Sequence, residues 1–277
     1  MKRFYKVHEL GTDFVLFDGR NDPETDWNAL SARVCDRHTG IGAAGALILL
    51  PSDVADVRMR RINADGTDAQ SYGDGIRALA RFAFETGMVR GTAVSVEAGA
   101  DILKTRVLLK DGRVERVRVD LGIPLLDAKD ITDKAESRAQ NLPLTAGGRT
   151  FTVSSVRVGA PHTVVFVDAL SEADVLQYGP LIERDPQFLE GTNVDFIEIP
   201  GLDRIKLRTW ERGTGYTPAC AEGACAAVVA AVLGGKLGRN AEVELARGTL
   251  DVAWSAADNH VYLTGPAEIV FSGLWND

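Results

Sequence analysis

Two stretches of the chain match each other at a spacing of 148 residues, measured from Tyr72 to Cys220. Residues 72–91 (YGDGIRALARFAFETGMVRG) and 220–239 (CAEGACAAVVAAVLGGKLGR) both place an acid and a glycine before an apolar run that ends at a glycine. This pattern predicts one helix in each stretch. Because the runs are apolar almost all round, we expect both helices to be enclosed by protein.

The same spacing extends beyond the helices. Residues 57–60 (VRMR) and 205–208 (IKLR) alternate as strands do, and Gly11 falls on Gly159. Downstream, residues 94–99 (VSVEAG) match 243–248 (VELARG) one residue further on. The chain is therefore predicted to be a duplication, in which each α/β half has several short strands, one buried helix and more strands.

The duplication predicts two domains in the 277 residues. We expect the first to span 1–122, completed by a C-terminal strand at 267–277, and the second to span 145–266. The polar segment between them, roughly 123–144, is expected to be a linker.

Composition limits the function classes. The chain is 45% apolar and 25% charged, with a net charge of −8, which is ordinary for a globular protein and unfavourable for binding a phosphate backbone. It has an odd number of cysteines, no signal-peptide pattern at its start and no uncharged stretch of the ~20 residues that a membrane span needs. We expect a cytoplasmic protein with no nucleic-acid or membrane partner.

The start of each predicted helix can bind an anion. Backbone N–H groups and the positive end of the helix dipole point away from the first turn, and a small carboxylate suits such a position. If a pseudo-twofold axis relates the halves, the two helix starts face each other across a cleft. The residues immediately before the helices, Tyr72 and Cys220, would then be directed at one point.

Of the three cysteines, Cys220 is the candidate reagent. A helix N-terminus stabilises a thiolate, although free cysteine is more often a small buried apolar residue. Cys225 and Cys35 are expected to pack in the core, and the cysteine spacing does not fit a zinc site. Tyr72 is either an acid/base group or a side chain that fills space.

Two acids accompany the helix starts, Asp74 and Glu222. Their ordinary role is to complement the helix dipole, which we favour over catalysis. A carboxylate at this position opposes an anionic substrate unless it turns away or is protonated, and the sequence leaves these alternatives open.

Six motifs resemble those of the diaminopimelate epimerase family, in the same order and over the whole chain. They are HELGTDFVLFDG (8–19), DRHTGIGA (36–43), NADG (63–66), GAPH (159–162), ERGTG (211–215) and ACAEGACAA (219–227). The resemblance implies an α+β fold of two pseudo-twofold-related domains, each a curved, mostly antiparallel sheet or barrel around a central helix.

The resemblance also implies an activity. Members of this family are isomerases of lysine biosynthesis that epimerise an amino acid without pyridoxal phosphate or another cofactor. One cysteine removes the α-proton, a second returns a proton on the opposite face, and the α-carboxylate lies on backbone N–H groups at both helix starts. The implied partner is a small amino-acid-like substrate carrying a carboxylate, and the family favours a homodimer.

The match at individual residues is partial. Cys220 matches one catalytic cysteine, and Tyr72 occupies the position of the other. Thr12 and Ala160 replace family asparagines. The implied substrate-binding residues are Thr12, Asn63, Gly73, Asp74, His162, Asn193, Glu211, Arg212, Ala221 and Glu222. Since the departures cluster at the site, we expect an altered substrate.

Two alternatives to a two-base epimerase remain. A one-base isomerase or dehydratase would use Cys220, Asp74 or Glu222 alone, with Tyr72 lining its pocket. A derivative without catalysis would only bind a ligand. The joint presence of Cys220, Asn63, Asn193, Glu211 and Arg212 favours an enzyme.

Overall fold

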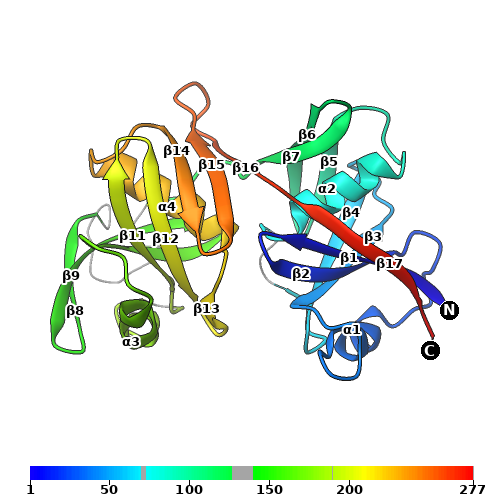
Figure 1. Cartoon of the computed structure of the whole chain (residues 1–277), viewed down its shortest axis with the longest axis horizontal. Helices are drawn as coiled ribbons and strands as arrows, with labels where there is room; N and C mark the ends of the chain where they lie inside the picture. Colours follow the sequence, from blue (N-terminus) through cyan, green and yellow to red (C-terminus); the bar gives the residue numbers. More distant parts are fainter. Residues whose placement is uncertain (70–72, 127–139, 189, 277) are drawn as a thin grey trace. The chain divides into compact units, whose positions relative to one another are not determined.

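The computed structural model describes residues 1–69, 73–126, 140–188 and 190–276, which form two compact units (Figure 1). The first unit comprises Met1–Asp120 and Thr264–Asp277, and the second comprises Leu121–Leu263. The described parts of the segment that the sequence indicated as a linker, 123–126 and 140–144, belong to the second unit.

In the first unit a curved sheet accompanies two helices, α1 (Trp27–Cys35) and α2 (Ile76–Glu85). The strands pair in the order β17, β1, β2, β3, β4, β5, β6, β7, parallel between β2 and β3 and between β4 and β5, and antiparallel elsewhere. Their bounds are β1 (Lys2–Glu9), β2 (Thr12–Asp18), β3 (Gly45–Leu50), β4 (Val57–Asn63), β5 (Ala93–Ala98), β6 (Asp101–Lys110), β7 (Arg113–Asp120) and β17 (Glu268–Trp275).

The second unit repeats this connectivity around α3 (Glu172–Glu183) and α4 (Ala221–Leu233). Its strands pair in the order β8, β9, β10, β11, β12, β14, β15, parallel between β10 and β11 and between β12 and β14. Their bounds are β8 (Leu142–Ala146), β9 (Arg149–Val158), β10 (Ala160–Phe166), β11 (Asn193–Gly201), β12 (Arg204–Glu211), β14 (Asn240–Leu245) and β15 (Gly248–Trp254). The short strand β13 (Gly215–Thr217) pairs with β12, and β16 (Val261–Gly265) runs from the end of the second unit into the first. The predicted duplication is confirmed.

Equivalent turns in the two units use equivalent glycines. Gly11 joins β1 to β2 with φ of 91°, and Gly159 joins β9 to β10 with φ of 66°. Both values lie in the left-handed region, where a side chain is strained and glycine is not. The matched glycines therefore share a left-handed backbone, although the first turn contains Leu10 as well as Gly11 and the second contains Gly159 alone.

The two central helices differ in how they begin. Residues 221–231 of α4 are buried throughout, and the helix contacts strands β9, β10, β11, β12, β14 and β15. α2 begins at Ile76, which is equivalent to residue 224 at the repeat spacing, so α4 has one more turn at its start. The difference lies at Gly75, whose φ of 89° is incompatible with a helical turn at this position.

Within the described ranges, no helix is both long and apolar enough to cross a membrane. The same residues contain no group of three or more His, Cys, Asp or Glu side chains arranged to hold a metal ion.

Candidate active site

Cys220 immediately precedes α4, as the sequence predicted. It is the N-cap of the helix, with extended backbone, and its Sγ accepts a hydrogen bond from the amide of Gly223 at 3.4 Å. The side chain is 6% exposed. A sulfur in contact with a first-turn amide lies where the helix favours negative charge.

The other two cysteines are core residues. Cys225 is fully buried inside α4, and Cys35 is buried at the end of α1. Burial raises the pKa of the Cys35 thiol to about 11, which disfavours a reactive thiolate. All three cysteines are buried, and Cys220 is the one that lies at the N-terminus of a helix.

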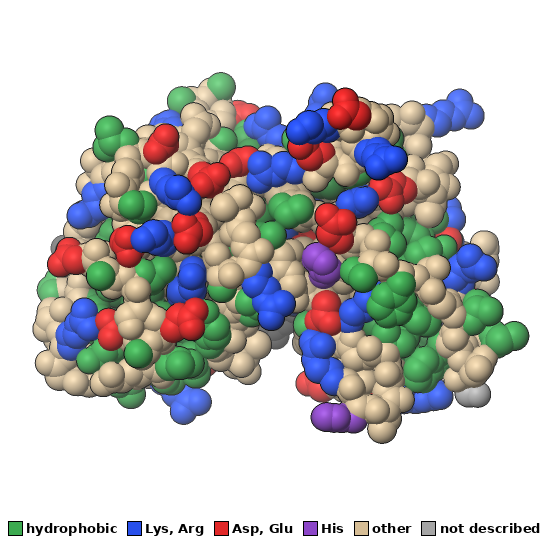
Figure 2. Space-filling view, viewed as in Figure 1, with side chains coloured by type: hydrophobic (Ala, Val, Ile, Leu, Met, Phe, Trp, Pro, Cys, Tyr) green, Lys and Arg blue, Asp and Glu red, His purple; other side chains and the backbone are tan. Residues whose placement is uncertain are grey.

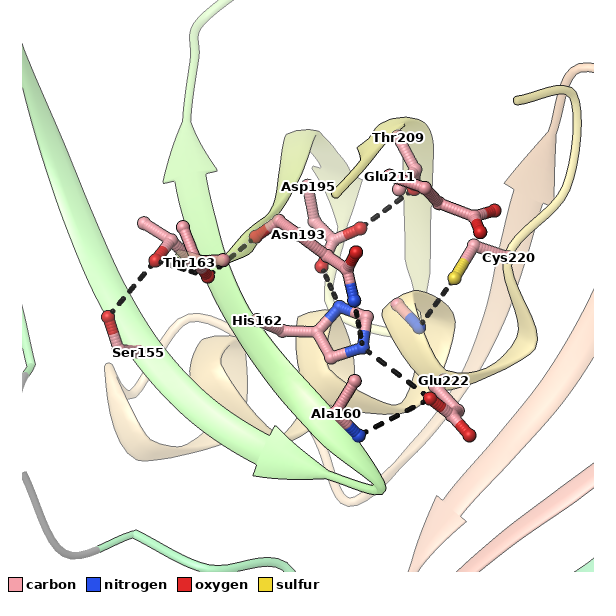
Figure 3. A network of polar contacts seen from close by, with 12 residues as sticks. Ser155, Ala160, His162, Thr163, Asn193, Asp195, Thr209, Glu211, Cys220 and Glu222 are labelled. Carbon is pink, nitrogen blue, oxygen red and sulfur yellow. Dashed lines mark hydrogen bonds and ion pairs between the residues drawn. The ribbon is translucent and has the colours of Figure 1, made fainter. Parts of the chain in front are cut away.

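A buried charged cluster lies beside the start of α4 (Figure 3). His162 on β10 places Nδ1 2.7 Å from Oδ2 of Asp195 on β11, and Nε2 4.0 Å from Oε2 of Glu222. Asp195 also accepts a hydrogen bond from the hydroxyl of Thr209 at 2.7 Å. The side chains of His162 and Asp195 are fully buried.

The carboxylates determine the charge of His162. Burial alone lowers the pKa of an imidazole, but Asp195, with Glu222 in support, outweighs burial and raises the pKa of His162 to about 10. Glu222 turns towards His162 and the amide of Ala160, with Oε2 3.4 Å from that nitrogen. Of the alternatives that the sequence left open, the structure shows a carboxylate directed at the ring of His162.

Two further predicted residues meet at the same place. Asn193, the first residue of β11, accepts a hydrogen bond from the backbone of Arg212 at 2.8 Å, and its amide nitrogen lies 3.4 Å from Nε2 of His162. Glu211 ends β12 and accepts a hydrogen bond from the hydroxyl of Thr217. Figure 3 shows the carboxylate of Glu211 on the same side as the sulfur of Cys220. Ala221 is the buried first residue of α4.

The predicted residues of the first unit lie at strand ends and immediately before α2. Thr12 begins β2, and Asn63 ends β4, where its amide donates to the hydroxyl of Thr67 at 3.0 Å. Gly73 and Asp74 precede the helix. Tyr72 lies outside the described residues.

A buried ion pair accompanies the start of α2, and sequence analysis did not identify it. Oε1 of Glu9 accepts a hydrogen bond from the amide of Ala78, and Oε2 lies 2.8 Å from Nη2 of Arg77. The two side chains are 0% and 2% exposed. Burial raises the pKa of Glu9, and the guanidinium of Arg77 opposes this shift. Glu9 therefore supplies the cap that Gly75 lacks.

The residues that sequence analysis missed share one signal. Asp195 interrupts the apolar run VDFI, and Arg77 interrupts the apolar run IRALA. A charged residue in such a run is buried unless the element ends, so it needs a partner. The sequence gives no indication of which residue that partner is.

The duplicated fold of this chain is shared with solved structures of low sequence identity. Solved structures with this fold include a probable proline racemase from Agrobacterium radiobacter K84, with a TM-score of 0.72 and 17% identity over 100% of this chain and 93% of that one. A predicted epimerase from Pseudomonas aeruginosa has a TM-score of 0.69 and 17% identity, with both chains fully covered. At this identity the similarity concerns the fold.

Sequence comparison defines the family. Residues 4–126 and 154–270 match the diaminopimelate epimerase family. Diaminopimelate epimerases from Pelotomaculum thermopropionicum and Moorella thermoacetica are each 44% identical, the first over 98% of this chain and 97% of its own, the second over 98% of both. The diaminopimelate epimerase of Methanococcus maripaludis is 38% identical, over 98% of both chains. This chain belongs to the diaminopimelate epimerase family, whose members are isomerases that act on amino acids without pyridoxal phosphate.

Proposed function

We propose that this protein epimerises an amino acid at its α-carbon through the thiol of Cys220. One observation carries the proposal: Cys220 is the N-cap of a buried helix, with its sulfur on the amide of Gly223. The α-proton of an amino acid is weakly acidic, so its removal needs a positioned base and stabilisation of the charge that develops. The first turn of α4 positions the base, Cys220, and places backbone N–H groups where they can stabilise the developing charge.

The binding of substrate is assigned by resemblance. We propose that the substrate's α-carboxylate lies on the backbone N–H groups of Ala221 and Glu222, where the helix dipole favours an anion. By the resemblance, Asn193, Glu211 and Arg212 of the second unit would recognise the amino-acid end of the substrate. The resemblance also assigns substrate-binding roles to Asn63, Gly73 and Asp74 of the first unit. The absence of any other cofactor and the cytoplasmic location remain expectations from the sequence.

We propose an altered substrate because the departures from the family pattern involve polar contacts. Thr12 and Ala160 stand where the resemblance implies asparagines. A substrate group left unpaired by such a change loses about 1–3 kcal/mol. Two such losses are enough to change which amino acid is preferred.

Tyr72 is proposed as the second acid/base group, and its hydroxyl can be tested alone. We expect Tyr72→Phe to lower the rate of epimerisation by about 100-fold or more, the usual value of a positioned acid or base. Tyr5→Phe is the control, since Tyr5 packs its ring against Phe82 at 4.6 Å. Full epimerisation by Tyr72→Phe would instead favour an enzyme with one base.

The homodimer implied by the resemblance is also a proposal. Exposed apolar side chains on β17 support it, namely Val270, Phe271 and Leu274, and Figure 2 shows apolar side chains gathered over this strand. An exposed apolar strand is a template for pairing with a second copy. We expect sedimentation to show a dimer of the 29.8 kDa chain that Phe271→Asp converts to monomer. A monomeric wild type would refute the proposal.

A further inference from the structure

The buried carboxylate of Asp195 has no role in the proposed proton transfer. It is fully buried on β11, and its polar contacts in the described chain include Nδ1 of His162 and the hydroxyl of Thr209, each at 2.7 Å. Leaving a carboxylate buried without a cation is very unfavourable. His162 is the group in contact with Asp195 that can carry a positive charge.

The opposite side of the imidazole ring distinguishes two protonation states. In a neutral ring with the proton on Nδ1, Nε2 would accept a long hydrogen bond from the amide of Asn193 at 3.4 Å. In an imidazolium, Nε2–H faces the carboxylate of Glu222 at 4.0 Å. Asp195 from β11 and Glu222 from α4 are the charged groups that face the ring, and two carboxylates on opposite sides favour the imidazolium.

We propose that Asp195 is a positioning residue that holds His162 as a fixed imidazolium beside the start of α4, so that the histidine neutralises Glu222 and does not transfer a proton. This role of Asp195 adds to the proposed function, and its importance for catalysis depends on that function. The pKa of His162, raised to about 10 by these carboxylates against the effect of burial, agrees with the geometry.

This arrangement explains how an acid is tolerated at an anion-binding helix start. The carboxylate of Glu222 alone would repel a substrate carboxylate on the first turn of α4. An imidazolium 4.0 Å away draws this carboxylate back and offsets its charge. Removing the positive charge from His162 would therefore weaken the binding of a substrate carboxylate. It would also destabilise the buried cluster of His162, Asp195 and Glu222.

Asp195 also contacts the backbone that positions Cys220. A β-carbon placed on Gly223 would lie 2.4 Å from Oδ1 of Asp195, so the first turn of α4 packs directly on this carboxylate. The amide of Gly223 donates to Sγ of Cys220. One acid thus fixes the histidine on one side and supports the cysteine cap on the other.

The test is ¹⁵N NMR of the histidine side chains in the full-length protein, which needs no substrate. The chain has four histidines, and His162→Gln identifies the signal of His162. At about pH 8, between the ordinary histidine pKa of 6.5 and the value of about 10, we expect both ring nitrogens of His162 to show imidazolium shifts. In Asp195→Asn, the ring should be neutral at the same pH.

Thr209→Val is the matched control, because it removes the other hydrogen bond to Asp195 and leaves the Asp195–His162 contact in place. We expect it to keep the imidazolium at about pH 8. A neutral His162 in the wild type would overturn the proposal, and so would an imidazolium that persists in Asp195→Asn. Should Asp195→Asn not fold, Glu222→Gln and the wild-type titration decide.

The failure of the proposed function can be told apart from the failure of this inference. A protein that exchanges no α-proton but shows the expected signals would contradict the function alone. A protein that epimerises an amino acid with a neutral His162 would contradict the inference alone.

Discussion

Replacing Cys220 by serine is expected to slow α-proton exchange strongly while the protein stays folded. Serine is a good N-cap residue, so it can accept the Gly223 amide that Sγ accepts now. Its hydroxyl is a far weaker acid than a thiol and cannot supply the base. We expect the exchange rate to fall by about 100- to 10,000-fold, measured by proton NMR in heavy water.

Cys225→Ala is the matched control for this prediction. Cys225 lies on the same helix and is fully buried, so its replacement changes packing without touching the helix start. We expect exchange to stay within several-fold of wild type, with a modest loss of stability. Cys220→Ser with near-wild-type exchange would remove the thiol from the mechanism.

Breaking the Glu9–Arg77 pair is expected to give the largest loss of stability. The side chains are 0% and 2% exposed, so Arg77→Met leaves a buried carboxylate without its partner. We expect the free energy of unfolding to fall by about 3–5 kcal/mol, measured by urea denaturation at neutral pH. Adding Glu9→Gln should recover much of this loss, because an amide oxygen can still accept from Ala78.

Arg20→Met is the control for the buried pair. Arg20 forms an ion pair with Asp18 in the same unit, but the two side chains are 37% and 33% exposed. We expect its loss to cost about 1 kcal/mol or less. An equal effect of Arg20→Met and Arg77→Met would show that the buried pair adds nothing specific to α2.

Much of the fold follows from periodicity in the sequence. The spacing between Tyr72 and Cys220 predicted two equivalent halves, and the structure repeats the same parallel and antiparallel pairings in both units. Apolar runs predicted two enclosed helices. α4 is buried over residues 221–231, whereas α2 is buried mainly over its first turns and ends at the exposed Glu85. Such features are local or repeated, so a single sequence is sufficient to reveal them.

The differences between the halves could not be predicted in the same way. The late start of α2 depends on the left-handed backbone of Gly75 and on a cap from Glu9, which lies far from it in sequence. A glycine permits that conformation but does not require it. The Asp195–His162 contact likewise joins two strands, β11 and β10, whose register is set by the folded sheet.

The central claim is that this protein labilises the α-proton of an amino acid without a cofactor. Its most direct test is deuterium incorporation at Cα, followed by proton NMR with wild-type protein, no added cofactor and a panel of amino acids that includes the diaminopimelate isomers. We predict incorporation with inversion of at least one amino acid, and slower exchange for diaminopimelate than for the preferred substrate. The absence of incorporation into every member of the panel, by protein shown to be folded, would contradict the claim.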